Sequence, residues 1–305
     1  MSVTLPLQLL LVMAQTLSGG SVQGRGNLLH EVEKRLCKTQ VQRLELSPYG
    51  GVSIKFMLRL SGGFTSIFKP EQSHYSARYE AEIAAYRLAA LLGVNQVPAA
   101  CERRIPLKSL QELAADPKQA ALLARLGREL RPDAEGMVRG AAIDWIPHVR
   151  ELPAAQRQDW AKWLSPGAPV PPLQRARLGE IADLLLLDLL FGNPDRFTGG
   201  NLLEARTTGR LLMIDNSADF RPVSALGRPY HLEQLAMLRR VRAVTYQRMR
   251  QLDRKSVIAL VRRPAGQGSY LTYPEIRAFF ARRDALVRHV EELRRAHGDE
   301  AVLLP

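Results

Sequence analysis

The sequence is poor in cysteine and in established metal-binding motifs. Its 305 residues include only Cys37 and Cys101, without a C-x-x-C motif, and its six histidines form no H-E-x-x-H motif. Two thiols exclude a disulfide-rich framework and a zinc site built from several cysteines. A single disulfide remains open for an exported protein.

The sequence also lacks a long apolar segment. The stretch from Leu5 to Gly20 has an apolar part about as long as a signal-peptide core, but no Lys or Arg precedes it and no clear A-x-A site follows. It is too short to cross a membrane, and no other segment approaches that length, so we expect no transmembrane span. We favour a leader or helix over residues 1–40 and a cytoplasmic protein. A signal peptide, and hence a secreted or periplasmic protein, is the alternative.

Acidic residues are in deficit, with 30 Asp and Glu against 43 Lys and Arg, giving a net charge of +13. Hydrophobic residues make up 46% and charged residues 24%, which is typical of globular proteins and excludes wholesale disorder. A basic chain favours acidic partners such as nucleotide phosphates, acidic proteins, membranes or nucleic acid. The arginines of residues 239–250 are more typical of a solvated helix face, and no nucleic-acid recognition motif surrounds them, so nucleic acid is disfavoured.

Hydrophobic periodicity divides the chain into two halves of different character. Residues 41–68 alternate between apolar and polar and are interrupted by glycine turns, which predicts a three-stranded antiparallel meander ending at Pro70. Residues 76–94 show helical spacing, with Gly93 suited to a helix C-cap. Residues 94–105 then predict one or two more strands.

The second half is mainly helical. Two short amphipathic helices are expected within residues 107–135, and residues 136–149 return to strand character. A short helix and a proline-rich connector precede a long apolar helix over residues 173–192. After a short strand ending near Asp215, everything beyond Tyr230 has helical periodicity, including residues 231–252 as one segment. The order indicates an α+β fold.

Lys69 stands at the end of the third expected strand, after two apolar residues. A lysine there loses hydration unless it meets an anion. The following helix offers Glu80 and Glu82, and protein kinases use such a lysine–glutamate pair to hold ATP phosphates. A surface ion pair is the simpler alternative.

Three more polar residues follow the long apolar helix. Asp195 and Asn201 lie in a glycine-containing loop, and Asp215 ends the next apolar strand. In phosphoryl transfer one aspartate orients the nucleophile, while an asparagine and a second aspartate hold Mg²⁺. Each residue alone is readily explained as a turn, a cap or a strand end. Their combination with Lys69 favours the functional interpretation.

These segments resemble atypical kinases. GNPDRFTGGNLL followed by LLMIDNSADF is similar to the GNxDRxxxN…IDxxxxF signature of the actin-fragmin kinase, phosphatidylinositol 3- and 4-kinase, HipA-like, and Fam20 and four-jointed secretory kinases. The strand ending in FKP and the helix containing EIAAYRL resemble their N-terminal lobe. The resemblance implies a bilobal fold, with an N-lobe and hinge over residues 41–148, a helical insert at 107–135, and a C-lobe over 149–305.

The resemblance also implies roles for the nucleotide-binding residues. Lys69 would contact the phosphates of ATP and Glu82 would pair with it, with Glu80 as the alternative partner. Gly50 and Gly51 would lie over the phosphates. Residues 137–147 would supply the hinge against adenine, with the backbone of residues 139–142 as the favoured edge.

The catalytic roles follow from the same resemblance. Asp195 would be the catalytic aspartate, and Asn201 and Asp215 would bind Mg²⁺ or Mn²⁺. This implies an ATP-dependent kinase, with a protein Ser or Thr as the favoured acceptor and an acidic substrate suited to the basic chain. A lipid or sugar acceptor, or a nucleotide-binding pseudokinase, is the alternative.

The sequence departs from the signature in three places. Phe197 replaces a histidine common in relatives, and the loop is one residue longer, which Gly199 and Gly200 could absorb. Asn216 and Ser217 replace the Phe-Gly of a DFG motif, and Asp219 is a rival metal ligand. Arg196 either orients the loop through an ion pair or packs on the preceding helix, and we favour the second role.

Overall fold

The computed structural model describes residues 31, 33–48, 53–74, 77–114, 116, 119–153, 157–198, 200–223, 226–263 and 267–305. The apolar stretch within residues 1–30, and Gly50, Gly51 and Gly199, lie outside the described residues, so the expectations attached to them stay predictions. Among the described helices, none has both the length and the apolar character needed to cross a membrane.

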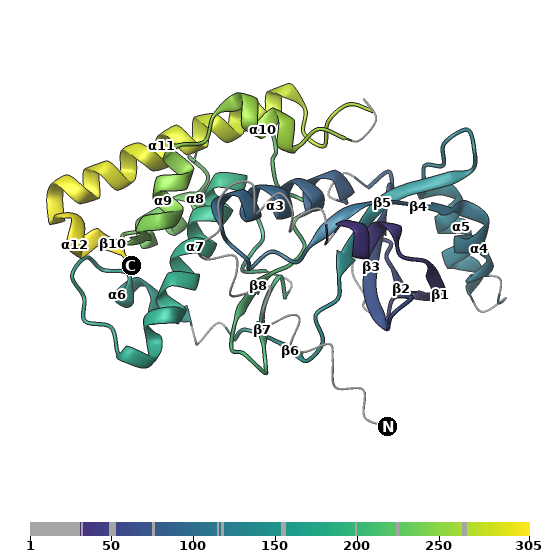
Figure 1. Ribbon diagram of the computed structural model, residues 1–305, viewed down its shortest axis with the longest axis horizontal. Helices are drawn as coiled ribbons and strands as arrows, with labels where there is room; N and C mark the ends of the chain where they lie inside the picture. The colour runs from purple at the N-terminus through teal and green to yellow at the C-terminus, as the bar shows by residue number, and fades with distance from the viewer. Residues whose placement is uncertain are drawn as a thin grey trace.

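The N-terminal half forms a five-stranded antiparallel sheet in the order β1-β2-β3-β5-β4 (Figure 1). Its strands are β1 (Val41–Leu46), β2 (Phe56–Leu60), β3 (Phe64–Pro70), β4 (Ala100–Pro106) and β5 (Met137–Asp144). Helix α3 (Tyr79–Leu92) packs against β4 and β5. The two predicted short helices, α4 (Leu107–Glu112) and α5 (Ala120–Glu129), share a second apolar cluster with the sheet.

Alternation along β3 places Lys69 toward the site. Successive side chains of a strand point to opposite faces. Phe68 lies in the cluster shared with α4 and α5, so Lys69 points to the other face. Gly140 pairs with Pro70 across the ladder, and a Cβ on Gly140 would lie 2.4 Å from the carbonyl oxygen of Lys69. The close approach of β3 and β5 at this point therefore requires glycine.

The C-terminal half is built around helix α7 (Arg175–Phe191), which is buried along most of its length. The helices α8 (Pro229–Met237), α9 (Ala243–Arg250), α10 (Arg254–Leu260) and α11 (Tyr273–His297) follow it in sequence, and α8 and α11 pack on α7. A second sheet joins β6 (Val149–Glu151), β7 (Leu202–Ala205) and β8 (Leu211–Met213) in that order, and its β7–β8 hairpin follows the polar loop after α7. Shorter elements complete the lobe: α6 (Trp160–Trp163), η4 (Pro172–Gln174), β9 (Val241–Arg242), α12 (Asp299–Val302) and β10 (Leu303–Leu304).

The prediction of one continuous helix over residues 231–252 is wrong. The chain leaves α8 and forms the short strand β9, which pairs in parallel with β10 at the C-terminus, before α9 begins. Arg242 of this strand also donates to Asp183 of α7 at 2.9 Å. These tertiary partners override a local pattern that is compatible with a helix.

The predicted edge of the hinge at residues 139–142 is also wrong. Residues 139–142 lie inside β5, whose two edges are both hydrogen-bonded, to β3 on one side and to β4 on the other. Their backbone groups are therefore not available to a ligand. The connection between the lobes runs from the end of β5 at Asp144 to β6.

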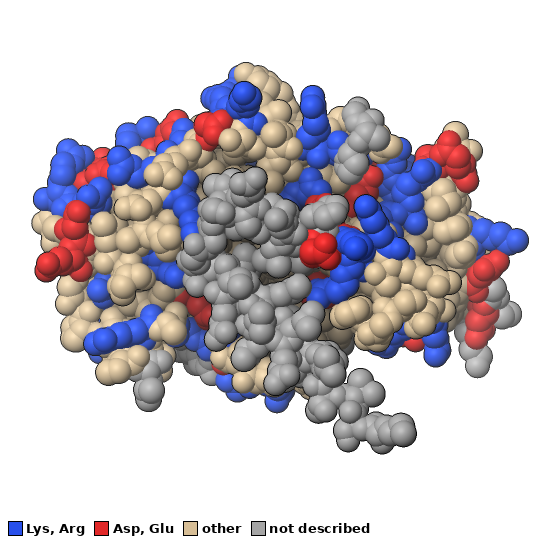
Figure 2. All heavy atoms as spheres, in the orientation of Figure 1, with Lys and Arg blue, Asp and Glu red and all other residues tan. Residues whose placement is uncertain are grey.

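The arginines of residues 239–250 largely bond within the protein. Arg240 donates to the carbonyl oxygen of Ala168, Arg248 to that of Leu92, and Arg250 pairs with Glu291. Figure 2 shows Lys and Arg side chains distributed among acidic and neutral residues over the face that it draws. The segment is therefore less solvated than expected, because several of its arginines are partly buried and bonded to the rest of the protein.

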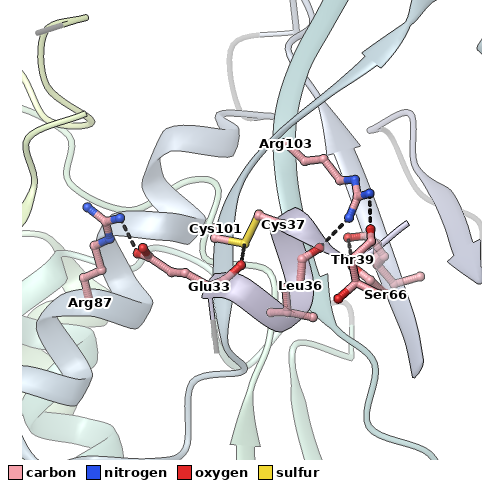
Figure 3. Close-up of a disulfide and its surroundings, with 9 residues drawn as sticks. Glu33, Leu36, Cys37, Thr39, Ser66, Arg87, Cys101 and Arg103 are labelled. Atoms are coloured by element: carbon pink, nitrogen blue, oxygen red, sulfur yellow. Dashed lines mark hydrogen bonds and ion pairs between the residues drawn. A yellow bond between two sulfur atoms is a disulfide. The ribbon is translucent and has the colours of Figure 1, made fainter. Parts of the chain in front are cut away.

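A disulfide joins Cys37 to Cys101 and so attaches η1 (Lys34–Lys38) to β4 (Figure 3). Arg103 reinforces the attachment by donating to the carbonyl oxygens of Leu36 and Thr39, at 2.6 and 2.5 Å. The bridge spans 64 residues of sequence. From the sequence alone, a single disulfide was a possibility that the cysteine count did not exclude.

Reduction of this disulfide is expected to lower the free energy of unfolding by about 2–4 kcal/mol, because the bridge restricts the unfolded chain. Urea unfolding of the oxidised and the reduced protein, which share one sequence, measures the difference. Coincident unfolding midpoints would show that the bridge contributes nothing to stability.

Candidate active site

Lys69 lies between two carboxylates that come from different lobes. Its Nζ is 2.5 Å from Oε1 of Glu82 on α3 and 2.8 Å from Oδ1 of Asp215, just after β8. Burial would lower the pKa of Lys69, but the two carboxylates outweigh it and raise the pKa above its usual value. The charge of Lys69 in turn holds the pKa of Asp215 far below its usual range. Lys69 and Asp215 are therefore charged at neutral pH.

The structure pairs Lys69 with Glu82 and not with Glu80. Residues two apart on a helix point about 200° apart, so the two glutamates face different neighbours. Glu82 is buried toward the sheet, whereas Glu80 pairs with Arg263 at 3.0 Å.

The loop after α7 is fixed at its start by a chain of hydrogen bonds. Gly192 ends the helix with a φ of 74°. Asn193 then accepts from the backbone N–H of Asp195 at 3.0 Å and donates to Oδ1 of Asp219 at 2.7 Å. Asp219 is fully buried, and burial raises its pKa well above the usual value. Asp219 thus holds the loop in place through Asn193. This role differs from that of a metal ligand, which the sequence had suggested for it.

Asp195 lies partly buried in the same loop. Its Oδ1 is buried and has no hydrogen-bond partner among the described residues. Burial raises its pKa, and the neighbouring charge of Asp215 raises it further. Asn201 donates its side-chain N–H to the backbone oxygen of Asp195 at 3.2 Å, which closes the loop. Gly200 within this loop has a φ of 75°, a conformation that glycine adopts at little cost and that suits the extra residue.

Arg196 combines both of the roles considered for it. Its guanidinium is buried and pairs with Asp188 of α7, with Nε 3.0 Å from Oδ1. It also donates to the backbone oxygens of Asn201 and Ile214, at 2.9 and 2.5 Å. The ion pair therefore anchors the loop to the helix and holds the segment that carries Asp215.

A second branch of this network reaches Glu82. Arg196 donates to Oδ1 of Asn216 at 2.7 Å, and the backbone N–H of Asn216 donates to Oε2 of Glu82 at 3.1 Å. Asn216, which replaces the phenylalanine of a DFG motif, thus links the lysine–glutamate pair to the polar loop.

Asp215 is held in an unusual backbone conformation. Its φ of 55° lies in the left-handed region, which aspartate tolerates better than most residues. The hydroxyl of Ser217 donates to Oδ1 of Asp215 at 2.7 Å. The side chain of Asp215 remains about one third exposed. The carboxylate is thus oriented by Lys69 and Ser217 while part of it stays open.

Phe197 packs where relatives often have histidine. Its ring meets Trp160 of α6 edge to face, with centroids 6.2 Å apart, and the guanidinium of Arg157 lies 4.8 Å from the ring centroid. The substitution therefore fastens the loop to the flank of the C-lobe and removes no charge from Asp195.

Lys55 belongs to the site and was missed in the sequence. It is partly buried just before β2, and burial lowers its pKa, as does the charge of Lys69, while Asp215 and Glu82 oppose the shift. A lysine between the buried Ile54 and Phe56 is the signal that could have identified it.

The residues present suit a hard cation bound together with phosphate. Asp215, Asn201 and Asp195 offer only oxygen ligands, as Mg²⁺ and Mn²⁺ require. Among the described residues, no group of three or more His, Cys, Asp or Glu side chains could hold a metal without further ligands. A metal at this site would complete its coordination with phosphate oxygens and water.

Sequence comparison connects the chain to named kinases, although no protein-family model matches it. The chain is 26% identical over 233 residues to a glycosaminoglycan xylosylkinase of Danio rerio and 25% identical over 213 residues to that of Homo sapiens. These matches cover 63% and 56% of this chain, and 56% and 52% of the relatives. The chain thus spans about half the length of the curated relatives that it matches.

Solved structures decide the fold. A hydra Fam20 structure with sugar matches 90% of this chain and 91% of its own, with a TM-score of 0.66 and 23% identity. The chain has the Fam20 kinase-like fold. The Golgi casein kinase matches 93% of the chain and 80% of its own at a TM-score of 0.64 and 18% identity, and its Mn/ADP-bound form at 0.63. The predicted resemblance to atypical kinases of the Fam20 type, and the bilobal α+β fold, are confirmed.

Proposed function

We propose that this protein is an ATP- and metal-dependent kinase that transfers the γ-phosphate to a hydroxyl group. One observation carries the proposal: Lys69 lies between Glu82 and Asp215, while the same network fixes Asp195 with an unpaired carboxylate oxygen. The kinase names of the relatives, and the Mn/ADP bound to a neighbour of the same fold, support it.

Each residue then has a defined role. Lys69 and Lys55 bind the phosphates of ATP, and Glu82 keeps Lys69 in place. Asp195 accepts the proton of the attacking hydroxyl through Oδ1, which has no hydrogen-bond partner among the described residues. A bound Mg²⁺ or Mn²⁺, held by Asp215 and Asn201, would neutralise charge on the phosphates.

The acceptor that we propose is a sugar hydroxyl. Both curated relatives are named xylosylkinases, and one structural neighbour was solved with sugar. A protein Ser or Thr, which the sequence favoured, is the second candidate because the Golgi casein kinase shares the fold. Comparing phosphate transfer to a β-xyloside with transfer to a serine peptide decides between the two acceptors.

We propose an oxidising compartment in place of the cytoplasm. The Cys37–Cys101 disulfide persists in secretory and periplasmic environments and is rare in reducing ones. The name of the Golgi kinase agrees with this placement. Mass spectrometry of the protein isolated without reductant tests it, because free thiols at both positions would contradict the proposal.

Lys69→Ala is expected to weaken Mn-ADP binding about 10–100-fold, because it removes a charged hydrogen-bond donor to phosphate. Calorimetric titration measures the change. Lys108→Ala, at an exposed lysine of α4, is the matched control and should bind like wild type. Equal affinity in the two variants would remove Lys69 from the nucleotide site.

A further inference from the structure

A small pocket of about 100 Å³ opens beside the polar loop. Its wall includes Pro194, the residue before Asp195. The other residues that matter here are Arg221, Arg228, Tyr230, His231 and Arg282. Nothing in the roles assigned above uses this pocket.

The pocket is strongly cationic. Three arginines and no carboxylate occur among its described lining residues. Arg282 is 1% exposed and donates to backbone carbonyl oxygens, including those of Leu190 at 2.9 Å and Val223 at 2.6 Å. Within the described ranges, no carboxylate forms an ion pair with it. Burial lowers the pKa of Arg282 to about 10, so the guanidinium stays charged at neutral pH. The carboxylate of Asp219 opposes this shift without an ion pair to Arg282 among the described residues, so an anion in the pocket would add a counter-charge in direct contact.

His231 is an unpaired polar side chain that faces the same pocket. It is 2% exposed, and neither ring nitrogen has a hydrogen-bond partner among the described residues. Burial, together with the charges of Arg282 and Arg228, lowers its pKa to about 4, so the ring is neutral at pH 7. A neutral imidazole keeps one N–H donor, which buried groups almost always satisfy. A ligand in the pocket would satisfy it.

Helix α8 adds a third favourable feature. It begins at Pro229, and its N-cap residue Arg228 makes no side-chain cap hydrogen bond. The N-terminus of a helix carries partial positive charge and unpaired N–H groups, which favour anions. The buried histidine and the arginines lie at this same end of the helix.

The pocket adjoins the reacting groups. Arg221 lies close enough to Asp195 to oppose the rise of its pKa, and the charge of Asp195 contributes to the raised pKa of Tyr230. We propose that the pocket binds an anionic group of the acceptor glycan, a uronate carboxylate or a sulfate ester, beside the hydroxyl presented to Asp195. The inference rests on the proposed sugar-kinase function and adds that the acceptor carries a negatively charged group. A neutral acceptor would bring no anion to the buried charge of Arg282, whose described hydrogen bonds go to backbone carbonyl oxygens.

The test compares two ligands that differ in one group. Methyl β-D-glucuronide and methyl β-D-glucoside are titrated by NMR into the protein with Mg-ADP present. We expect the glucuronide to bind at least about tenfold more tightly, as one charge-assisted hydrogen bond would give. Glucose 6-sulfate in a third titration shows whether sulfate or carboxylate is preferred, and inorganic sulfate should compete with either.

Three variants locate the effect. Arg228→Ala and His231→Leu should each reduce the preference for the glucuronide to about threefold or less, since each removes a donor. Arg206→Ala, at an exposed arginine of the β7–β8 turn, should leave it unchanged. His231→Leu should not lower the melting temperature, because it removes a buried donor that has no partner. This separates a binding role from a structural one.

Equal binding of glucuronide and glucoside, or a preference unaffected by both pocket variants, would overturn the inference. Tighter binding of a glutamate-containing serine peptide through the same residues would overturn its assignment to glycans. Phosphate transfer to a neutral xyloside is measured separately. Transfer without a glucuronide preference removes only this inference, whereas a preference without transfer to any acceptor removes only the kinase function.

Discussion

Asp195→Asn is expected to lower the rate of phosphoryl transfer by about 10²–10⁴-fold, the usual contribution of a general base. The change removes the carboxylate that would accept the proton of the attacking hydroxyl, while an amide of similar shape keeps the loop in place. The backbone bonds from Asn193 and Asn201 do not depend on the lost charge. Steady-state transfer from ATP, measured with calorimetric binding of Mn-ADP, reports both quantities.

The control for this variant is Asp299→Asn, at an exposed aspartate that pairs with Arg294 far along the chain. It should transfer phosphate at the rate of the wild type. If Asp195→Asn kept more than about a tenth of the wild-type rate, Asp195 would not be the base. If it lost Mn-ADP binding as well, its role would lie in nucleotide binding.

Arg196→Leu is expected to lower the free energy of unfolding by about 3–5 kcal/mol, because it leaves the buried charge of Asp188 unpaired. Burial already raises the pKa of Asp188 to about 6 with Arg196 present. A carboxyl group with a raised folded-state pKa destabilises the fold once it must ionise. The loss should therefore be larger at pH 8 than at pH 5, where protonation removes the charge.

Urea unfolding at the two pH values measures this loss. Arg206→Leu, at an exposed arginine, should change stability little, and Asp188→Leu combined with Arg196→Leu should recover part of the loss because no buried charge remains. A loss of less than about 1 kcal/mol in the free energy of unfolding at pH 8 would be no larger than that of an exposed ion pair. It would contradict the anchoring role of Arg196.

The sequence predicted the elements whose burial depends on their own periodicity. The alternation of residues 41–68 identified the meander and the position of Lys69 at its end, whereas the face to which Lys69 points follows from the apolar cluster around Phe68. The break at β9 could not be predicted, because it depends on pairing with β10, which comes last in the chain. The misplaced hinge has a similar cause, since only the sheet order shows that β5 lies between β3 and β4.

The site likewise combines residues that a local motif predicted with contacts that depend on the tertiary structure. A motif marked Lys69, Asp195, Asn201 and Asp215, but the choice of Glu82 required the direction of α3 relative to the sheet. The support of Asp195 by Asn193 and Asp219 was not visible because these partners meet only when the segment after β8 folds under the loop. The cationic pocket likewise joins three segments that are distant in sequence.

The most direct test of the proposed kinase function is to identify the molecule that receives the γ-phosphate of ATP. Phosphorus NMR can follow a mixture of the wild-type protein, ATP, Mg²⁺ and a glycan acceptor over time. We expect the γ-phosphate signal to fall while ADP and a phosphomonoester on the acceptor rise together, and Asp195→Asn to slow both changes by about 10²–10⁴-fold. ATP that binds but persists unchanged, or that yields only inorganic phosphate with every sugar and serine acceptor, would contradict it.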